Sequence, residues 1–154
     1  MKAQKTRVAV GSDHAGYELK EFVKSLVTSL GYAVDDEGTH STESVDYPDV
    51  AEKVALRVAG GRASLGILSC GTGIGASIAA NKVKGIRAAL VKDEETARLS
   101  REHNDANVLA LAGRPFDRDL VEKMVRVWLA TPFAGGRHLA RVNKITAIEN
   151  RYLQ

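Results

Sequence analysis

The chain alternates short apolar runs with longer segments of helical periodicity, and this alternation constrains its fold more than any other feature. Five runs have the length and composition of strands, at residues 7–12, 32–35, 65–69, 86–91 and 108–112. Apolar residues at helical spacing fill the intervals, so we expect helices over 19–30, 48–59 and 74–83, from 93 onward, and over 117–128 and 139–151. Such alternation forms a parallel sheet covered on both faces. The sequence therefore predicts an α/β fold in one domain, residues 1–154.

The composition argues against several classes of protein. The longest apolar stretches fall far short of the ~20 residues that span a bilayer. The net charge is only +3, with 22 basic and 19 acidic residues interleaved along the chain, which gives little support for nucleic-acid binding. The single cysteine cannot form an internal disulfide. We therefore expect a soluble cytoplasmic protein that binds neither nucleic acid nor a membrane.

Polar and glycine-rich segments directly follow two of the expected strands. Asp13 and His14 follow the first strand, and the segment CGTGIG, residues 70–75, follows the third. Ligands of parallel α/β sheets bind beyond the carboxyl ends of the strands. Glycines there leave backbone N–H groups free to point at one anion, and the start of the next helix favours negative charge. Cys70 is therefore a candidate for chemistry, although it is alternatively a small buried side chain beside a tight turn.

The same glycine segment also fits a nucleotide-binding pattern. Gly71, Gly73 and Ala76 match G-x-G-x-x-A, and Asp93 or Glu94 lies about 20 residues onward. That pattern usually follows the first strand of its unit, whereas here it follows the third. The Gly-Lys-Ser/Thr ending of the Walker pattern is absent from the segment. A non-catalytic nucleotide-binding module therefore stays open as an alternative.

A second group of candidates combines histidines with arginines. Arg137 and Arg141 are four residues apart around the start of the last expected helix, with His138 between them, so all three can bind one phosphate dianion. A solvated basic helix face is the alternative reading. His103 lies in a polar stretch, whereas we expect His40 to be solvated. Paired cysteines and H-E-x-x-H are absent, so no zinc signature competes.

Five segments together resemble the ribose-5-phosphate isomerase B family, which also includes galactose-6-phosphate and allose-6-phosphate isomerases. They are GSDHAGYELK at 11–20, GTHSTESVDYPD at 38–49, CGTGIGASIAANK at 70–82, REHNDANVLALAGR at 101–114 and GGRH at 135–138. The resemblance implies a three-layer α/β/α sandwich with a five-stranded, Rossmann-like parallel sheet and a C-terminal helix. It also implies a homodimer with active sites shared between subunits and no metal or organic cofactor. Whether dimers pair into tetramers is left open, as is which residues cross the interface.

The resemblance also implies roles for residues at matching positions. Cys70 would move the proton between C1 and C2 of a small phosphorylated sugar, Thr72 would stabilise the enediolate, and His103 would assist opening of the furanose ring. Asp13 would hold sugar hydroxyls or the ring oxygen. The positions that match phosphate ligands are His14, Arg114, Arg137, His138 and Arg141. The other substrate-binding positions are Tyr47, Gly71, Gly73, Ile74, Gly75 and Asn104.

The expected reaction is the interconversion of ribose 5-phosphate and ribulose 5-phosphate in the pentose phosphate pathway, through a cis-enediol. Such a reaction needs a base beside donors that stabilise the developing oxyanion, and the glycine segment offers both. One branch of the family uses a glutamate just after this segment as base, and here that place is Ala76. His40, Ala140 and Asn143 depart from residues common in the family. A six-carbon sugar-phosphate isomerase is therefore the alternative.

Overall fold

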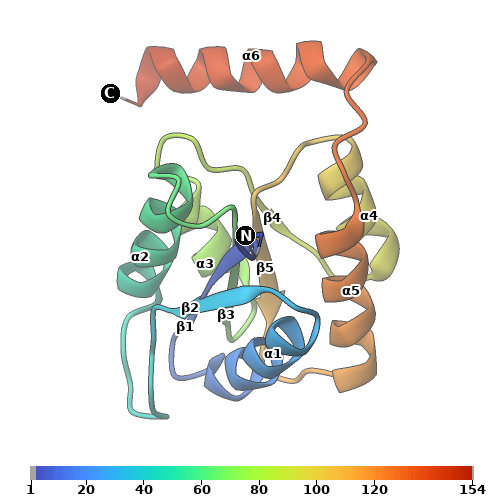
Figure 1. The fold of residues 1–154 in the computed structure, drawn as a ribbon. Helices are drawn as coiled ribbons and strands as arrows, with labels where there is room; N and C mark the ends of the chain where they lie inside the picture. The colour runs from blue at the N-terminus through green and yellow to red at the C-terminus, as the bar shows by residue number, and fades with distance from the viewer. Residues whose placement is uncertain (1–2, 154) are drawn as a thin grey trace.

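The computed structural model describes residues 3–153, in which five strands alternate with six helices (Figure 1). The elements are β1 (Arg7–Ser12), α1 (Tyr17–Ser29), β2 (Ala33–Asp36), α2 (Tyr47–Ala59), β3 (Leu65–Cys70), α3 (Ile74–Ala80), β4 (Ala88–Leu90), α4 (Glu94–Glu102), β5 (Val108–Ala112), α5 (Arg118–Ala130) and α6 (Arg137–Tyr152). Every pairing in the sheet is parallel, and the strand order is β2-β1-β3-β5-β4. The predicted α/β class with a five-stranded parallel sheet is confirmed.

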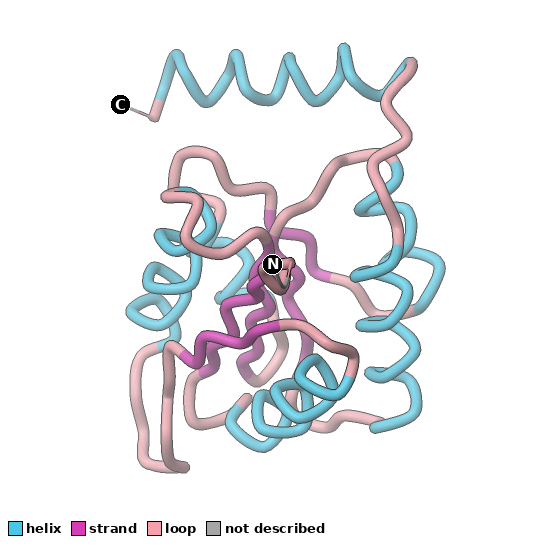
Figure 2. Tube along the Cα trace, in the orientation of Figure 1, coloured by secondary structure: helices cyan, strands magenta, loops and turns pink. Residues whose placement is uncertain are grey.

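Two apolar clusters lie on opposite faces of this sheet. Val8 and Val10 of β1 pack with residues of α1 and α5, including Trp128, whereas Ala9 between them packs with α2. This alternation follows from the period of two in a strand. Figure 2 shows the strands enclosed by helices on both sides, which confirms the three-layer sandwich.

Most element boundaries lie within two residues of the sequence-based prediction, and the region between α3 and β4 differs most. Helix α3 ends at Ala80, and β4 begins only at Ala88. The Asn81 side chain accepts a hydrogen bond from Ala88 N at 2.8 Å and donates one to Ala88 O at 3.0 Å, which ties the two ends together. Leu120 has the helical spacing of the buried Met124 and Trp128 but is exposed, because it lies in the first turn of α5 and lines a small surface pocket beside Phe116.

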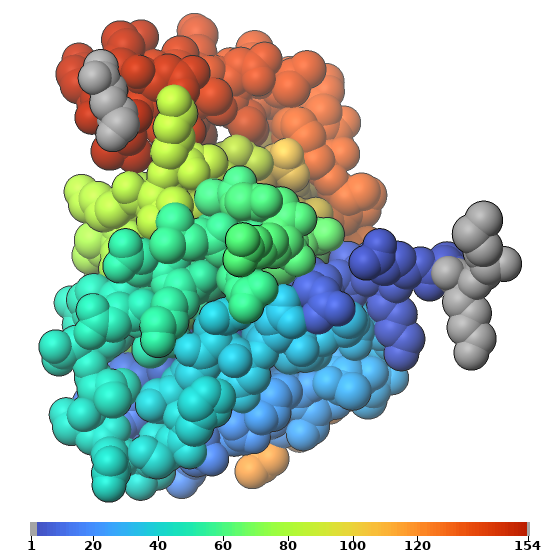
Figure 3. Space-filling model, turned by 60° about the vertical axis from the view of Figure 1, so that its left-hand side comes forward, coloured from blue at the N-terminus to red at the C-terminus, as the bar shows by residue number. Residues whose placement is uncertain are grey.

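Helix α6 stands apart from the sandwich. In Figure 1 it lies across the top, beyond the amino ends of the strands, and Figure 3 shows it over the segment around residues 80–90. A cleft of about 490 Å³ separates it from the β4 region and is lined by Ile86, Ala106, Ile145 and Ile148, among others. The Glu149 carboxylate accepts the Gly85 N–H at 2.7 Å across this cleft. Much of the apolar face of α6 is therefore uncovered within the chain. No helix among residues 3–153 has the length and apolarity to cross a membrane.

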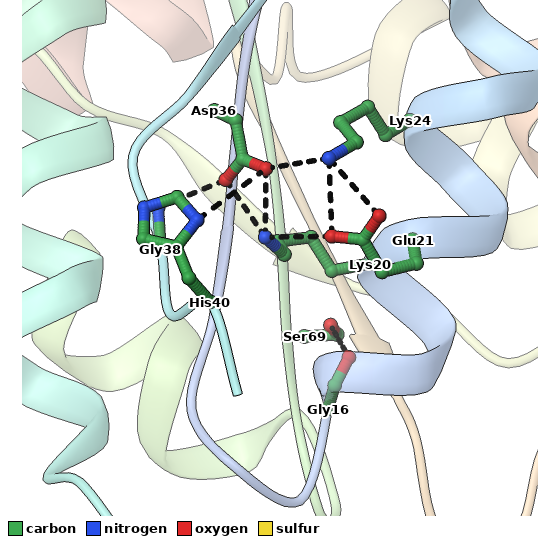
Figure 4. Close-up of polar contacts among 8 residues, drawn as sticks. All are labelled: Gly16, Lys20, Glu21, Lys24, Asp36, Gly38, His40 and Ser69. Carbon is green, nitrogen blue, oxygen red and sulfur yellow. Dashed lines mark hydrogen bonds and ion pairs between the residues drawn. The ribbon is translucent and has the colours of Figure 1, made fainter. Parts of the chain in front are cut away.

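A cluster of charged side chains ties β2 to α1 (Figure 4). Lys20 Nζ lies 2.8 Å from each carboxylate oxygen of Asp36, and Lys24 Nζ lies 2.9 Å from one of them. The Gly38 N–H also donates to Asp36, at 2.9 Å. Burial alone raises the pKa of Asp36, but hydrogen bonds from Lys20, Lys24 and Gly38 outweigh it and hold the pKa at about 2. Asp36 is therefore ionised throughout the physiological range.

Replacing this carboxylate tests its contribution to stability. Because the folded-state pKa of about 2 lies below the ordinary value of 3.8, the contribution is complete above about pH 5 and is lost as the pH falls through about 2. Urea unfolding of the native chain and Asp36→Asn should therefore give a difference in unfolding free energy that shrinks between pH 5 and pH 2.5. We expect it to shrink by about 1 to 2 kcal/mol, allowing for solvent screening. A difference independent of pH contradicts the assignment.

Candidate active site

The chain turns sharply after β3, and this turn fixes the environment of Cys70. The residue is only 4% exposed, and its Sγ accepts a hydrogen bond from the Gly73 N–H at 3.2 Å. The Thr72 Oγ1 accepts the Ile74 N–H at 3.2 Å. Gly73 has φ of +77°, and a Cβ there would lie 2.6 Å from Leu90 and 2.9 Å from the backbone of Leu111. The turn therefore requires glycine, and it aims a backbone donor at the sulfur.

The segment after β1 packs directly against the end of β3. Asp13 is buried, and its carboxylate accepts the Gly16 N–H at 3.0 Å. The Ser69 hydroxyl donates to Gly16 O at 2.9 Å, so the residue before Cys70 holds the same turn. His14 extends in the other direction, and its Nδ1 lies 3.2 Å from both the backbone nitrogen and oxygen of Val45. The loop between β2 and α2 is thereby joined to the end of β1.

Two further segments reach the same edge of the sheet. After β5, Gly113 N donates to Cys70 O at 2.8 Å and Arg114 N donates to Gly71 O at 3.1 Å. At the start of α2, the Tyr47 ring lies against Gly75, where a Cβ would come within 2.5 Å of it. We call the residues gathered here the carboxyl-edge group: Asp13, His14, Tyr47, Cys70, Gly71, Thr72, Gly73, Ile74, Gly75 and Arg114.

The remaining predicted residues form a second group around a pair of histidines. His103 caps the end of α4, and its ring stacks on that of His138 with centroids 4.1 Å apart and an interplanar angle of 13°. Ala134 N donates to Glu102 O at 3.0 Å, which ties the segment before α6 to the end of α4. We call this set the amino-edge group: His103, Asn104, Arg137, His138 and Arg141.

The amino-edge group carries an excess of positive charge. Burial lowers the pKa of His138, and the nearby His103, Arg137 and Arg141 lower it further, against an opposing effect of Glu102. Arg137 and Arg141 are exposed on the first turns of α6. An imidazole beside two exposed guanidinium groups is suited to binding a phosphate dianion.

The two groups lie at opposite edges of the sheet. Cys70 pairs with Ala112 at the end of β5, whereas His103 and Asn104 precede Val108 at its beginning. The four residue steps of β5 alone separate these edges by about 13 Å. His103 therefore does not face the thiol loop of its own chain, and the predicted residues do not gather into one site within a single chain.

Sequence reasoning missed three residues with contacts near this edge of the sheet, namely Ser69, Lys20 and Asp36. The only signal for Ser69 was its place beside Cys70, from which it faces the opposite side of the strand. His40 is exposed, as expected, with its Nδ1 4.0 Å from Asp36. In the described part of the chain, no three or more His, Cys, Asp or Glu side chains form a group able to hold a metal ion.

The chain is similar to several known proteins in sequence and in fold. A family model described as Ribose/Galactose Isomerase matches residues 8–145. Ribose-5-phosphate isomerase B of Escherichia coli strain K12 is 49% identical, over 94% of this chain and 97% of its own. The solved structure of Clostridium thermocellum ribose-5-phosphate isomerase B has a TM-score of 0.94 at 52% identity, covering 96% of this chain and 99% of that one. A Mycoplasma genitalium structure with bound ribulose-5-phosphate has a TM-score of 0.90 at 41% identity, with 96% and 99% coverage.

Two glycine substitutions test how the thiol turn is built. Gly73→Ala should lower the free energy of unfolding by at least about 2 kcal/mol, because the left-handed backbone and the fixed Leu111 backbone leave no room for Cβ. Gly75→Ala should cost less than about 1 kcal/mol, because the Tyr47 side chain can move and alanine favours helix. Urea unfolding of both variants measures these losses. Equal losses of unfolding free energy contradict this account of the turn.

Proposed function

The chain belongs to the ribose/galactose isomerase family, and on that premise we propose that it interconverts D-ribose 5-phosphate and D-ribulose 5-phosphate. The observation that carries the proposal is the buried Cys70 thiol, which accepts a backbone N–H at the carboxyl edge of the sheet beside the Asp13 turn. The relatives from Escherichia coli and Clostridium thermocellum are both named ribose-5-phosphate isomerase B. The nucleotide-binding alternative is less well supported, because the Asp93 carboxylate is engaged in capping α4, 2.7 Å from Thr96 N.

The proposed chemistry is a proton transfer between adjacent carbons. As thiolate, Cys70 takes the proton from C2 of the open-chain aldose and returns it to C1, while the hydroxyl proton moves from O2 to O1. Thr72 and the first N–H groups of α3 stabilise the enediolate that forms between these steps. Asp13 holds the sugar hydroxyls, and Tyr47 lines the sugar site. This chemistry uses only the side chains and backbone of the protein.

The proposed site is completed by a second copy of the chain. Ring opening by His103 and phosphate binding by Arg137, His138 and Arg141 act on the same substrate as Cys70, yet these groups lie at the opposite edge of their own sheet. A homodimer resolves this separation if it places the amino-edge group of one subunit over the carboxyl-edge group of its partner. In that arrangement Asn104 lies at the sugar, and His14 and Arg114 lie at the phosphate.

Exposed apolar side chains support the same assembly. Ile74 and Ile78 of α3 are 49% and 57% exposed, beside the carboxyl-edge group. Leu139, Ile145 and Ile148 are exposed along α6. A dimer that covers both helices removes this apolar surface from water.

The reaction would serve the pentose phosphate pathway, with residues 1–154 acting as one domain. We assign it to the cytoplasm, where the thiol that acts as base stays reduced.

A substrate panel tests the reaction. A coupled assay should show interconversion of ribose 5-phosphate and ribulose 5-phosphate with higher kcat/KM than allose 6-phosphate or galactose 6-phosphate. Cys70→Ala should lower kcat by at least about 1,000-fold while substrate still binds, because the change removes the base with little change of volume. Faster turnover of a six-carbon substrate would assign the chain a hexose phosphate as substrate. Near-native turnover by Cys70→Ala excludes the thiol as base.

Mixing two inactive variants tests the shared site. A heterodimer of Cys70→Ala and His103→Asn chains contains one doubly altered site and one intact site. If equal amounts are unfolded together and refolded, half of the dimers are mixed, so we expect about one quarter of native turnover. The matched control mixes Cys70→Ala with Thr72→Ala, which lie in the same group and leave no intact site. If the first mixture stays at the level of its parents, each chain uses its own His103.

A further inference from the structure

We propose that Lys20 is a positioning residue for this isomerase: its buried ammonium group fixes the segment after β2 against the end of β1, and thereby places His14 and Tyr47 beside Cys70. The inference rests on the proposed function, although Lys20 touches neither the reacting carbons nor the phosphate. It acts through Asp36 and the loop that Asp36 holds.

Lys20 is unusual in the degree to which its charge is buried. The side chain is 1% exposed, on the face of α1 that also buries Leu19 and Val23. Its Nζ is held at 2.8 Å by each oxygen of Asp36 and at 3.1 Å by Glu21 Oε1 (Figure 4). Two carboxylate groups thus contact the buried ammonium group. A lysine that is desolvated this far depends on its acceptors staying in place.

Asp36 transmits this constraint to the end of β1. It accepts the Gly38 N–H at 2.9 Å, and Gly38 O in turn accepts the Ser12 N–H at 2.7 Å. Thr39 N donates to Ser12 O at 2.7 Å, so this segment bonds both the backbone N–H and the carbonyl of Ser12. Ser12 directly precedes Asp13. The ammonium group therefore sets the position of the loop relative to the candidate site.

The loop held in this way supplies two contacts of the carboxyl-edge group. Its Val45 backbone meets the His14 ring at 3.2 Å, and it ends at Tyr47, whose ring lies against Gly75. The backbone of Lys20 adds a second link, because its N–H donates at 2.8 Å to the Gly16 carbonyl that Ser69 also holds. Figure 4 shows the bond between Ser69 and Gly16 at the start of α1.

Lys24 offers a matched control. It contacts the same Asp36 carboxylate at 2.9 Å, but its side chain is 34% exposed, so water can replace its ammonium group. Removing the charge of either lysine therefore takes one cationic partner away from Asp36. Only the loss of the Lys20 charge removes the buried partner.

The experiment compares Lys20→Met and Lys24→Met, since methionine keeps most of the side-chain length without the charge. For Lys20→Met we expect the KM for ribose 5-phosphate and the inhibition constant of inorganic phosphate to rise about 10- to 100-fold, with a smaller fall in kcat, because the displaced groups orient and bind the substrate. Lys24→Met should stay within about twofold of native in all three values. Equal effects of the two variants overturn the proposal.

A double variant separates positioning from loss of fold. Lys20→Met combined with Asp36→Asn leaves no buried carboxylate without its partner, and thermal melting followed by circular dichroism establishes that it is folded at the assay temperature. We expect it to retain the raised KM, and a folded double variant with native KM and native phosphate inhibition overturns the proposal. Calorimetric titration with inorganic phosphate needs no turnover. Weaker phosphate binding by the double variant therefore supports positioning even if the native chain isomerises none of the sugars tested.

Discussion

The turns that follow β1, β3 and β5 touch backbone to backbone, and the candidate active site depends on this contact. A Cβ at Gly113 would lie 2.9 Å from the Gly16 Cα and 3.2 Å from Cys70 O, and a Cβ at Gly16 would lie 2.6 Å from Ser69. Side chains would therefore force the three strand ends apart. Because Gly16 and Gly113 carry no side chains, the ends of these three strands stay close together. Asp13, Cys70 and Arg114 at these ends can therefore reach one ligand.

The charged contacts that fix this edge of the sheet lie on the side away from the Cys70 sulfur. The ion pairs of Asp36 with Lys20 and Lys24 lie on the α1 side of the loop, whereas the Cys70 sulfur lies on the side of α2 and α3. The electrostatic contacts that fix the loop are thus kept away from the thiol. Strong fixed charges near a reacting carbon bias proton transfer, so this separation lets the loop be rigid without altering the chemistry.

Local patterns in the sequence predicted most of the fold but only part of the site. The bounds of β1 and β5 agree with the structure, because each depends on a few adjacent residues. The early end of α3 was missed, because it depends on Asn81 bonding to Ala88. That Asp13 and Cys70 share an edge follows from the parallel sheet. The position of His103 at the other edge depends on where α4 ends, and the burial of Lys20 depends on a carboxylate sixteen residues away, which helical periodicity does not indicate.

Helix α6 carries Arg137 and Arg141 on a segment that its own sandwich leaves largely uncovered. Under the proposed assembly, a single chain holds every functional group but no complete site. Below the dissociation constant of the dimer, turnover would then rise with the square of chain concentration, and above it in direct proportion. The amount of active enzyme in a cell would thus respond more steeply to synthesis when the protein is scarce than when it is abundant.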